Sequence, residues 1–207
     1  MRRLRGDATP WLLLSLLLVA LAIRIYGIAW DQGSLFHPDE RAILMKVGEL
    51  SFPSLSNLGV LLDADKSPLN PRWFPYGSLP LYLLRLGSDI VGRFADPLSI
   101  AGMAILGRSF STILDTVSVL AVYLLGTRLY NRKVGLLAAA FTAFTVLHIQ
   151  LSHFYTVETI VTPFILLSLF FLWKVAEKGS LWGAALGGLF LGLALAVKVS
   201  AAPLALS

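Results

Sequence analysis

Several runs of about twenty apolar residues divide this chain, and a soluble core cannot accommodate them. The first run, WLLLSLLLVALAIRIYGIAW, covers residues 11–30 and contains one charged residue, Arg24. At about 1.5 Å per residue, a helix of this length can cross a hydrocarbon core of about 30 Å. Hydrophobic residues make up 57% of the chain and charged residues only 14%, whereas soluble domains are about a quarter charged. We therefore expect an integral membrane protein.

A cleaved signal peptide is the alternative interpretation of the first run. MRRLRG would be its positive amino-terminal region, and the stretch Ala20-Leu21-Ala22 resembles a cleavage site. The apolar run continues past that site and ends at Trp30, and interfacial aromatic residues of this kind anchor retained spans. We favour a retained span at 11–30, preceded by a cytoplasmic tail at 1–10.

Four further apolar runs predict membrane spans, which we place at about 103–127, 134–152, 159–175 and 181–201. The predicted fold class is therefore all-α. We expect a polytopic membrane helix bundle with about five spans, in a single transmembrane region that covers residues 1–207.

Residues 31–100 differ from the rest because they are rich in proline and charge and contain no long apolar run. We expect a long external loop that carries short interfacial helices at 38–50 and 78–94. Arg85, Asp89 and Arg93 recur at spacing four, so they share one face of the second helix. That pattern suits a helix in the membrane interface, and a short span is the alternative.

Charge sets the expected orientation. If the first span runs from inside to outside, bases gather on the inside, where the only acids are Asp7 and Glu177. The inside bases are Arg2, Arg3, Arg5, Arg128, Arg132, Lys133, Lys174 and Lys178. The external loop holds eight acids (Asp31, Asp39, Glu40, Glu49, Asp63, Asp65, Asp89 and Asp96) against six bases. The positive-inside rule then predicts a multi-pass protein of the plasma (inner) membrane with a cytoplasmic amino terminus.

In this orientation HPDE (37–40), SHFYTVE (152–158) and Lys198 all lie on the outer face. Asp39 and Glu40 could be a solvated helix start, or a general base or metal ligand at the membrane surface. Glu158 could cap a helix, or face a cavity at the mouth of a span. Arg108 and Lys198 could reach lipid headgroups, or bind the phosphate of a lipid ligand.

Other site types receive less support. The chain has no cysteine, which excludes thiolate chemistry and iron–sulfur clusters. His37, His153 and Glu158 could hold a divalent metal ion, although no spacing requires it. The net charge of +5 follows the membrane topology, so we expect no nucleic-acid partner.

The order of several stretches resembles the amino-terminal half of a GT-C glycosyltransferase, in the protein O-mannosyltransferase and aminoarabinose-transferase branch. The stretches are HPDERAILMKVGEL, NPRWFPYGSLPLYLL, LGRSFSTILDTVSVLAVYLLGTRLYNRKVGLLAAAF, QLSHFYTVETIVTPF and GLFLGLALAVKVSA. The resemblance covers nearly the whole chain. It implies a sugar donor linked to polyprenyl phosphate and an acceptor protein or lipid at the outer membrane face.

The resemblance also assigns roles. Asp39 becomes the general base of an inverting transfer to a hydroxyl or amine, Glu40 supports it, and Glu158 holds the acceptor or a bound cation. Arg108, Lys198 and Arg72 become substrate and phosphate contacts. Glu158 departs from the family pattern, which more often has aspartate there.

Such enzymes have about nine or more spans, so we expect this chain to be a truncated fragment that lacks part of the donor site and is inactive alone. A function of another class, a non-catalytic membrane subunit or part of a transporter, is the alternative. In it Arg108, Asp115, Glu158 and Lys198 would line a solute path.

Overall fold

The computed structural model describes residues 8–94 and 99–206, and within these ranges every regular element is a helix. The all-α prediction is therefore confirmed. The bundle contains α1 (Thr9–Ile25), α4 (Ile100–Leu129), α5 (Arg132–Phe144), α6 (Val146–Ser152), α7 (Val157–Lys178) and α8 (Leu181–Val197). Arg2, Arg3, Arg5, Asp7 and Asp96, which entered the charge argument, lie outside the described residues.

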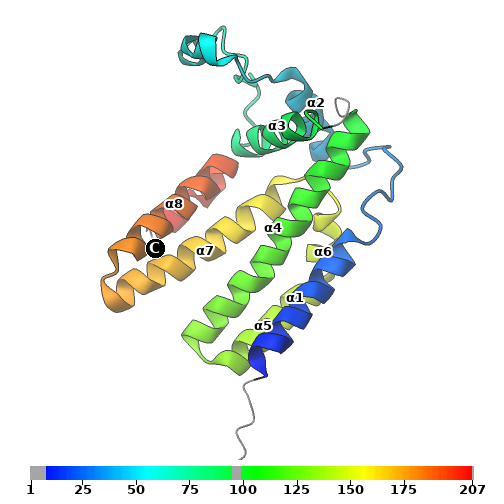
Figure 1. Ribbon diagram of the computed structural model, residues 1–207. Coiled ribbons are helices and arrows are strands. Elements are labelled where there is room, and N and C mark those ends of the chain that lie inside the picture. Colours follow the sequence, from blue (N-terminus) through cyan, green and yellow to red (C-terminus); the bar gives the residue numbers. More distant parts are fainter. Residues whose placement is uncertain (1–7, 95–98, 207) are drawn as a thin grey trace, which may run out of the picture.

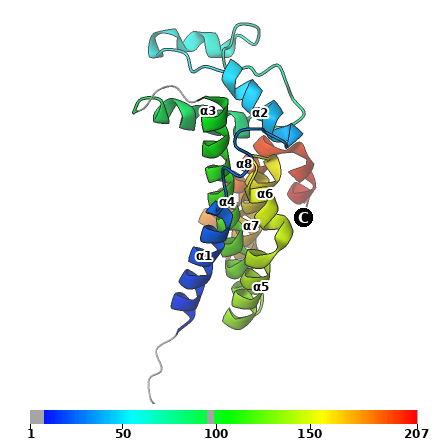
Figure 2. The ribbon, with the colours of Figure 1, turned by 90° about the vertical axis from the view of Figure 1, so that its right-hand side faces the viewer.

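A cap lies across one end of this bundle (Figures 1 and 2). It is formed by α2 (Pro38–Glu49), the 3-10 helix η1 (Leu55–Leu62) and α3 (Leu79–Val91). The two cap α-helices match the short helices expected at 38–50 and 78–94, whereas η1 was not expected. A final 3-10 helix, η2 (Val199–Leu206), turns back and packs against α8. We call the end that carries α2 and α3 the cap end.

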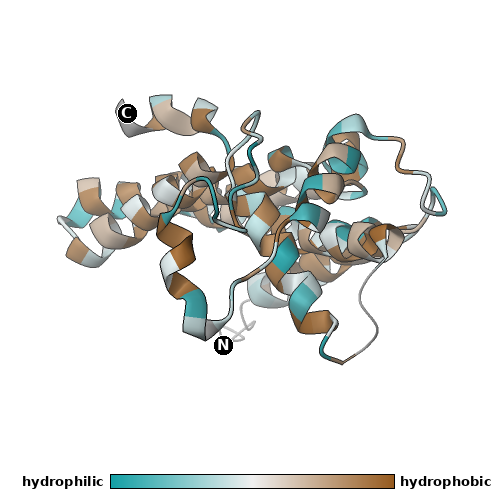
Figure 3. Cartoon of the chain, turned by 90° about the horizontal axis from the view of Figure 1, so that it is seen from above, coloured by the Kyte–Doolittle hydropathy of each residue, from teal (hydrophilic) through white to brown (hydrophobic). Residues whose placement is uncertain are grey.

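Two helices are long and apolar enough to cross a membrane by themselves, namely α4 and α7. The pair α5 and α6 adds a third span if it counts as one bent helix. The apolar helices α1 and α8 have 17 residues each, about 26 Å of helix and the lower limit of a spanning length. The five expected spans thus correspond to five apolar segments, of which two or three meet the length and composition of a span. Hydrophobic residues predominate along the helices of the bundle (Figure 3).

Two expected spans end earlier than the apolar pattern suggested. The first was placed at 11–30, but α1 ends at Ile25 because Tyr26 leaves the helical conformation and Gly27 follows with φ +75°. The last was placed at 181–201, but α8 ends at Val197 and Lys198 is extended. Apolar residues therefore continue beyond both helices, into turns after α1 and into η2 after α8.

The expected span at 134–152 is broken between α5 and α6, whose axes differ by 57°. Thr145 is extended at the break, with φ −65° and ψ 119°. The break frees the carbonyl oxygen of Ala143 from its place in the helical ladder, and Nη1 of Arg24 donates to it at 3.0 Å. A side chain that inserts into the backbone ladder is a recognised cause of a kink.

Arg24 belongs to a buried network inside the bundle. Its Nε donates to Oδ2 of Asp115 at 2.6 Å, and Nδ1 of His148 lies 2.6 Å from Oδ1 of the same carboxylate. Arg24 and Asp115 are at most 1% exposed. Asp115 is therefore paired within the bundle. The network joins α1, α4 and α6.

The main hydrophobic core lies between the cap and the bundle. Ile43, Leu44 and Val47 of α2 and Leu81 and Leu84 of α3 are nearly inaccessible and form one cluster with residues of α4 and α7. The cap is thus fixed to the bundle through its apolar face. This packing holds the first turn of α2, which carries Asp39 and Glu40, against the start of α7.

Candidate active site

Polar residues from four segments gather at the cap end. Asp39 and Glu40 occupy the first turn of α2, Glu158 occupies the first turn of α7, and Lys198 directly follows α8. Arg108 lies in the third turn of α4. Chain direction explains the gathering, because α4 and α7 begin at this end whereas α1 and α8 finish there (Figures 1 and 2).

Arg108 binds two carboxylates in a buried ion-pair cluster. Its Nη1 and Nη2 donate to the two oxygens of Asp31 at 2.8 and 2.7 Å. Its Nε and Nη2 donate to the two oxygens of Glu40 at 2.8 and 2.7 Å, and Nη1 also donates to the Ile28 carbonyl at 3.0 Å. These bonds use every N–H of the guanidinium. The arrangement leaves Arg108 no donor for the phosphate contact that the sequence suggested.

Asp31 also organises the loop that follows α1. Its carboxylate accepts hydrogen bonds from the backbone N–H of Gly33 at 3.2 Å and of Leu35 at 3.0 Å. Leu35 has φ +50°, a left-handed conformation that carries strain for a branched side chain. Hydrogen bonds from Arg108 hold the pKa of Asp31 far below its usual range despite burial. Asp31 is thus a carboxylate at neutral pH, and its bonds keep the loop in this shape.

Glu40 connects the cap to the loop before α7. Its Oε1 accepts from the backbone N–H of Tyr155 at 2.9 Å, and the Tyr155 hydroxyl donates to the Pro80 carbonyl at 2.7 Å. A Cβ added at Gly107 would lie 2.7 Å from Cγ of Tyr155, so only glycine admits the ring this close. Burial raises the pKa of Tyr155, which keeps its hydroxyl protonated. Glu40 therefore fixes α2 with respect to α3, α4 and α7.

Asp39 is the neighbour of Glu40 but has a different environment. Glu40 is fully buried, whereas Asp39 is partly exposed and forms no ion pair within the described residues. Consecutive helix positions point about 100° apart, so one acid can face the core and the next a cavity. The backbone N–H of Asp39 donates to Nδ1 of His37, which caps the helix. The Asp39 carboxylate stays partly exposed, and the hydroxyl of Tyr76 interacts with it.

Tyr76 links the environments of Asp39 and Glu158. Burial raises the pKa of Tyr76, the interaction with the Asp39 carboxylate raises it further, and the negative charge of Glu158 adds a smaller increase. The hydroxyl therefore remains protonated at neutral pH and can donate to a carboxylate. Trp73 packs edge-on against Tyr76, with 5.7 Å between ring centroids.

The loop that carries Tyr76 is held against the end of α8. The backbone N–H of Gly77 donates to the carbonyl of Val197 at 2.9 Å. A Cβ added at Gly77 would lie 1.9 Å from the carbonyl oxygen of Ala196, a distance that no side chain tolerates. Glycine is thus required for this approach, which places Tyr76 beside Lys198.

Lys198 and Glu158 form an ion pair with 3.0 Å between Nζ and Oε1, and both side chains remain partly exposed. Lys198 also lines a cavity of about 440 Å³, together with the loop at 74–78 and residues 199–200.

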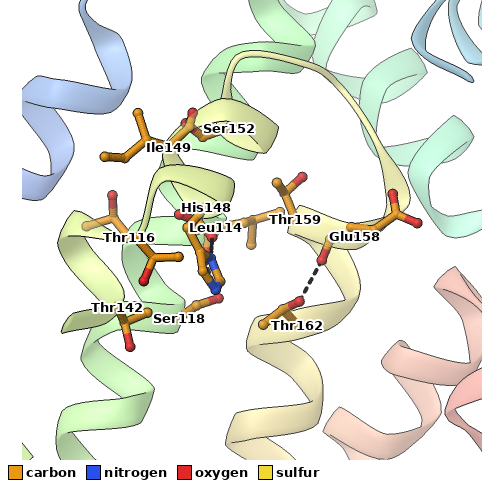
Figure 4. Close-up of polar contacts among 12 residues, drawn as sticks. Leu114, Thr116, Ser118, Thr142, His148, Ile149, Ser152, Glu158, Thr159 and Thr162 are labelled. Carbon is orange, nitrogen blue, oxygen red and sulfur yellow. Dashed lines mark hydrogen bonds and ion pairs between the residues drawn. The ribbon is translucent and has the colours of Figure 1, made fainter. Parts of the chain in front are cut away.

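In Figure 4, Glu158 lies at the start of α7, and His148 lies apart from it on α6. The carbonyl of Glu158 accepts from the Thr162 hydroxyl at 2.7 Å. The site therefore offers a cation beside a cavity and a carboxylate paired with it.

Arg72 is not joined to this group. It lies in the loop after η1, where its guanidinium donates to the Asp65 carbonyl, and its backbone has φ +48°. Among the described residues, Arg72 forms no ion pair with any acid of the site.

The suggested metal ligands are not assembled. The part of the chain that the structure describes contains no group of three or more side chains able to hold a metal ion. The His37 ring packs on Phe154, and both ring nitrogens of His153 face carbonyl oxygens, those of Ile149 and Tyr26. Glu158 is paired with Lys198. The described residues therefore do not bring His37, His153 and Glu158 together as one metal site.

A family model matches residues 80–207, and its description is dolichyl-phosphate-mannose-protein mannosyltransferase. The chain belongs to this family. It is thus a membrane glycosyltransferase at the family level, which agrees with the resemblance seen in the sequence. No curated protein matches the chain significantly. The family match includes Arg108, Glu158 and Lys198, whereas Asp39 and Glu40 precede it.

At the cap end Lys198 and Tyr76 line one cavity, and Tyr76 interacts with the Asp39 carboxylate. Sequence reasoning missed three residues of this site, namely Asp31, Tyr76 and Tyr155. Asp31 directly follows the first apolar run, and an acid at that position could have been matched with the buried Arg108. Tyr76 acts through its hydroxyl and Tyr155 through its backbone N–H. The positions of these tyrosines in the sequence give no signal for either contact.

Proposed function

We propose that this protein transfers a sugar from a polyprenyl-phosphate donor to an acceptor hydroxyl, with Asp39 as the general base. The observation that supports this most is the separation of two adjacent acids. Glu40 is buried and bound to Arg108 and Tyr155, whereas Asp39 is partly exposed beside Tyr76. A general base must keep access to the proton that it removes, and of the two acids Asp39 keeps it.

The proposed reaction is a single displacement. Asp39 takes the proton of the acceptor hydroxyl while the acceptor oxygen forms a bond to the anomeric carbon. The bond between that carbon and the phosphate oxygen breaks, and the polyprenyl phosphate leaves with the electron pair. The anomeric centre is inverted. The Tyr76 hydroxyl donates toward Asp39 and holds its carboxylate in place before the proton is transferred.

Lys198 is the proposed partner of the leaving phosphate. It lines the cavity next to Tyr76, and its ion pair with Glu158 is exposed enough to rearrange. Negative charge grows on the phosphate as the bond breaks, and a cation positioned there stabilises the transition state. Glu158 orients Lys198 in this arrangement and can contact the acceptor. Arg108 contributes indirectly, because it holds Glu40 and therefore the first turn of α2.

The location of the site fits a donor with a lipid tail. The tail of polyprenyl phosphate stays in the bilayer, and only its phosphate and sugar can reach polar residues. The cap end presents Glu158 and Lys198 at the ends of apolar helices and Asp39 in the first turn of the cap helix α2. We propose that this end faces the outer side of the membrane, because the bases Arg128, Lys174 and Lys178 lie at the opposite end.

A solute path receives less support. Its proposed residues, Arg108, Asp115, Glu158 and Lys198, belong to three separate groups. Arg108 is bound to Asp31 and Glu40, Asp115 to Arg24 and His148, and Glu158 to Lys198.

The test is sugar transfer by the full-length enzyme in membranes supplied with a polyprenyl-phosphate-linked sugar. Asp39→Asn should reduce turnover by about 100-fold or more while donor binding is unchanged. Asp63→Asn, a change in an exposed acid of the cap loop, is the matched control and should leave turnover unchanged. Transfer at the normal rate by the Asp39→Asn enzyme would rule out Asp39 as the base.

A further inference from the structure

A second polar cavity lies at the other end of α3, away from Lys198. Its volume is about 330 Å³, and it is formed by the last turns of α3 with one residue each from α2 and α4. The lining residues are Gly48, Arg85, Ser88, Asp89, Gly92, Arg93 and Met103. The mechanism proposed above uses none of them.

Ser88 is the unusual member of this cavity. The residue is only 9% exposed, yet its Oγ has no hydrogen-bond partner among the described residues. Buried hydroxyl groups are nearly always paired, and a serine in a helix commonly donates to the carbonyl four residues earlier. Ser88 lines the cavity, and a turn of its side chain about χ1 would bring this buried hydroxyl to a bound acceptor.

Two arginines make the cavity suitable for an anion. Arg85 donates from Nε and Nη2 to Asp89 at 3.2 and 2.5 Å, which leaves Nη1 without a partner. Arg93 is exposed, and its side chain has no partner within the described part of the chain. Asp89 is neutralised by Arg85, so the cavity retains one net positive charge. Phosphate oxygens fit guanidinium and hydroxyl donors of this kind.

The cavity lies beside exposed apolar residues of the cap. The side of α3 that carries Leu86 and Ile90 is about half-exposed, and Phe94 beyond it is 87% exposed. Exposed apolar residues on a cap helix are typical of an element that lies in the membrane interface. The arginines of the same helix then meet the phosphate layer of the bilayer.

We propose that this cavity binds the phosphodiester headgroup of an anionic phospholipid. Ser88 and the free Nη1 of Arg85 donate to one phosphate, and Arg93 closes over it from the rim. Binding anchors the cap helix α3 to the bilayer. The proposal is independent of the sugar-transfer mechanism, because no residue of the candidate active site takes part.

The experiment compares the full-length protein in nanodiscs of phosphatidylcholine alone and of phosphatidylcholine with phosphatidylglycerol. Native mass spectrometry counts the anionic lipids that remain bound, and thermal unfolding reports the stabilisation that they provide. Ser88→Ala and Arg93→Gln should each weaken retention of phosphatidylglycerol by about tenfold, since each removes a hydrogen bond to a charged group. Arg41→Gln, which changes an exposed arginine of α2 outside the cavity, is the matched control and should retain the lipid.

Ser88→Ala separates lipid binding from folding. The Ser88 hydroxyl has no protein partner, so its loss should not lower the unfolding temperature in phosphatidylcholine alone. Equal retention of phosphatidylglycerol by wild type, Ser88→Ala and Arg93→Gln would overturn the proposal. Inorganic phosphate that stabilises the protein in phosphatidylcholine as strongly as the anionic lipid would also overturn it, because the ligand would then be a free anion.

Discussion

Glu40 and Arg108 lie 68 positions apart and form a two-point ion pair, with Nε–Oε1 at 2.8 Å and Nη2–Oε2 at 2.7 Å. The same guanidinium binds both oxygens of Asp31. The Arg108 guanidinium thus connects the third turn of α4 to the loop after α1 and to the start of α2. This cluster supports the position of Asp39, one residue before Glu40.

Removal of the cation should destabilise the protein strongly. Arg108→Ala leaves two carboxylates buried without a partner, and we expect the free energy of unfolding to fall by about 3–5 kcal/mol. Arg108→Lys should recover only part of the lost free energy of unfolding, because an ammonium cannot bind two carboxylates in a planar fork. Thermal unfolding in detergent measures both. Lys66→Ala, at an exposed ion pair with Asp63, should change stability by less than about 1 kcal/mol. An unchanged unfolding temperature in Arg108→Ala would contradict the assigned role.

Asp31 should make stability depend on pH. Arg108 lowers the pKa of Asp31 in the folded state, so its carboxylate stabilises the fold above the unfolded pKa of about 4. This contribution is lost as the pH falls below that value toward the folded pKa. The unfolding temperatures of wild type and Asp31→Asn should therefore differ most at pH 7 and converge as the pH falls below about 4. A difference that stays constant over this range would show that the Asp31 charge does not contribute.

Gly77 should be intolerant of any side chain. Gly77→Ala would force the loop away from the carbonyl of Ala196 and break the bond to Val197, so Tyr76 would move from Asp39. We expect turnover to fall by about tenfold or more, with a smaller loss of stability. Gly59→Ala is the matched control, because nothing lies within 4 Å of a Cβ at that position. Equal turnover in the two variants would show that the position of Tyr76 does not matter.

The sequence predicted the fold class and the gathering of polar segments because both follow from long-range patterns. Apolar runs predicted the helices, and the alternation of their directions placed Glu158 and Lys198 at the same end. The positions of Asp39 and Glu40 at the start of α2 followed from Pro38 and the acids in the first turn.

The resemblance assigned different roles to Asp39 and Glu40, but the sequence could not show that Arg108 binds Glu40, because that contact spans 68 positions of the chain. It also could not reveal the break at Thr145. The 134–152 stretch is apolar enough to predict one span, and Arg24, which binds the Ala143 carbonyl beside the kink, comes from another helix. Tyr76 was equally hidden, since its place beside Asp39 depends on a backbone contact between Gly77 and Val197.

The separate roles of the two adjacent acids lead to one paired comparison. Turnover and unfolding temperature should be measured in parallel for Asp39→Asn and Glu40→Gln, in the full-length enzyme with a polyprenyl-phosphate-linked sugar as donor. Asp39→Asn should lose turnover and keep the wild-type unfolding temperature, whereas Glu40→Gln should lower the unfolding temperature because it weakens a buried ion pair. An Asp39→Asn enzyme that turns over normally, or a Glu40→Gln enzyme with unchanged stability, would contradict this division between a chemical and a structural acid.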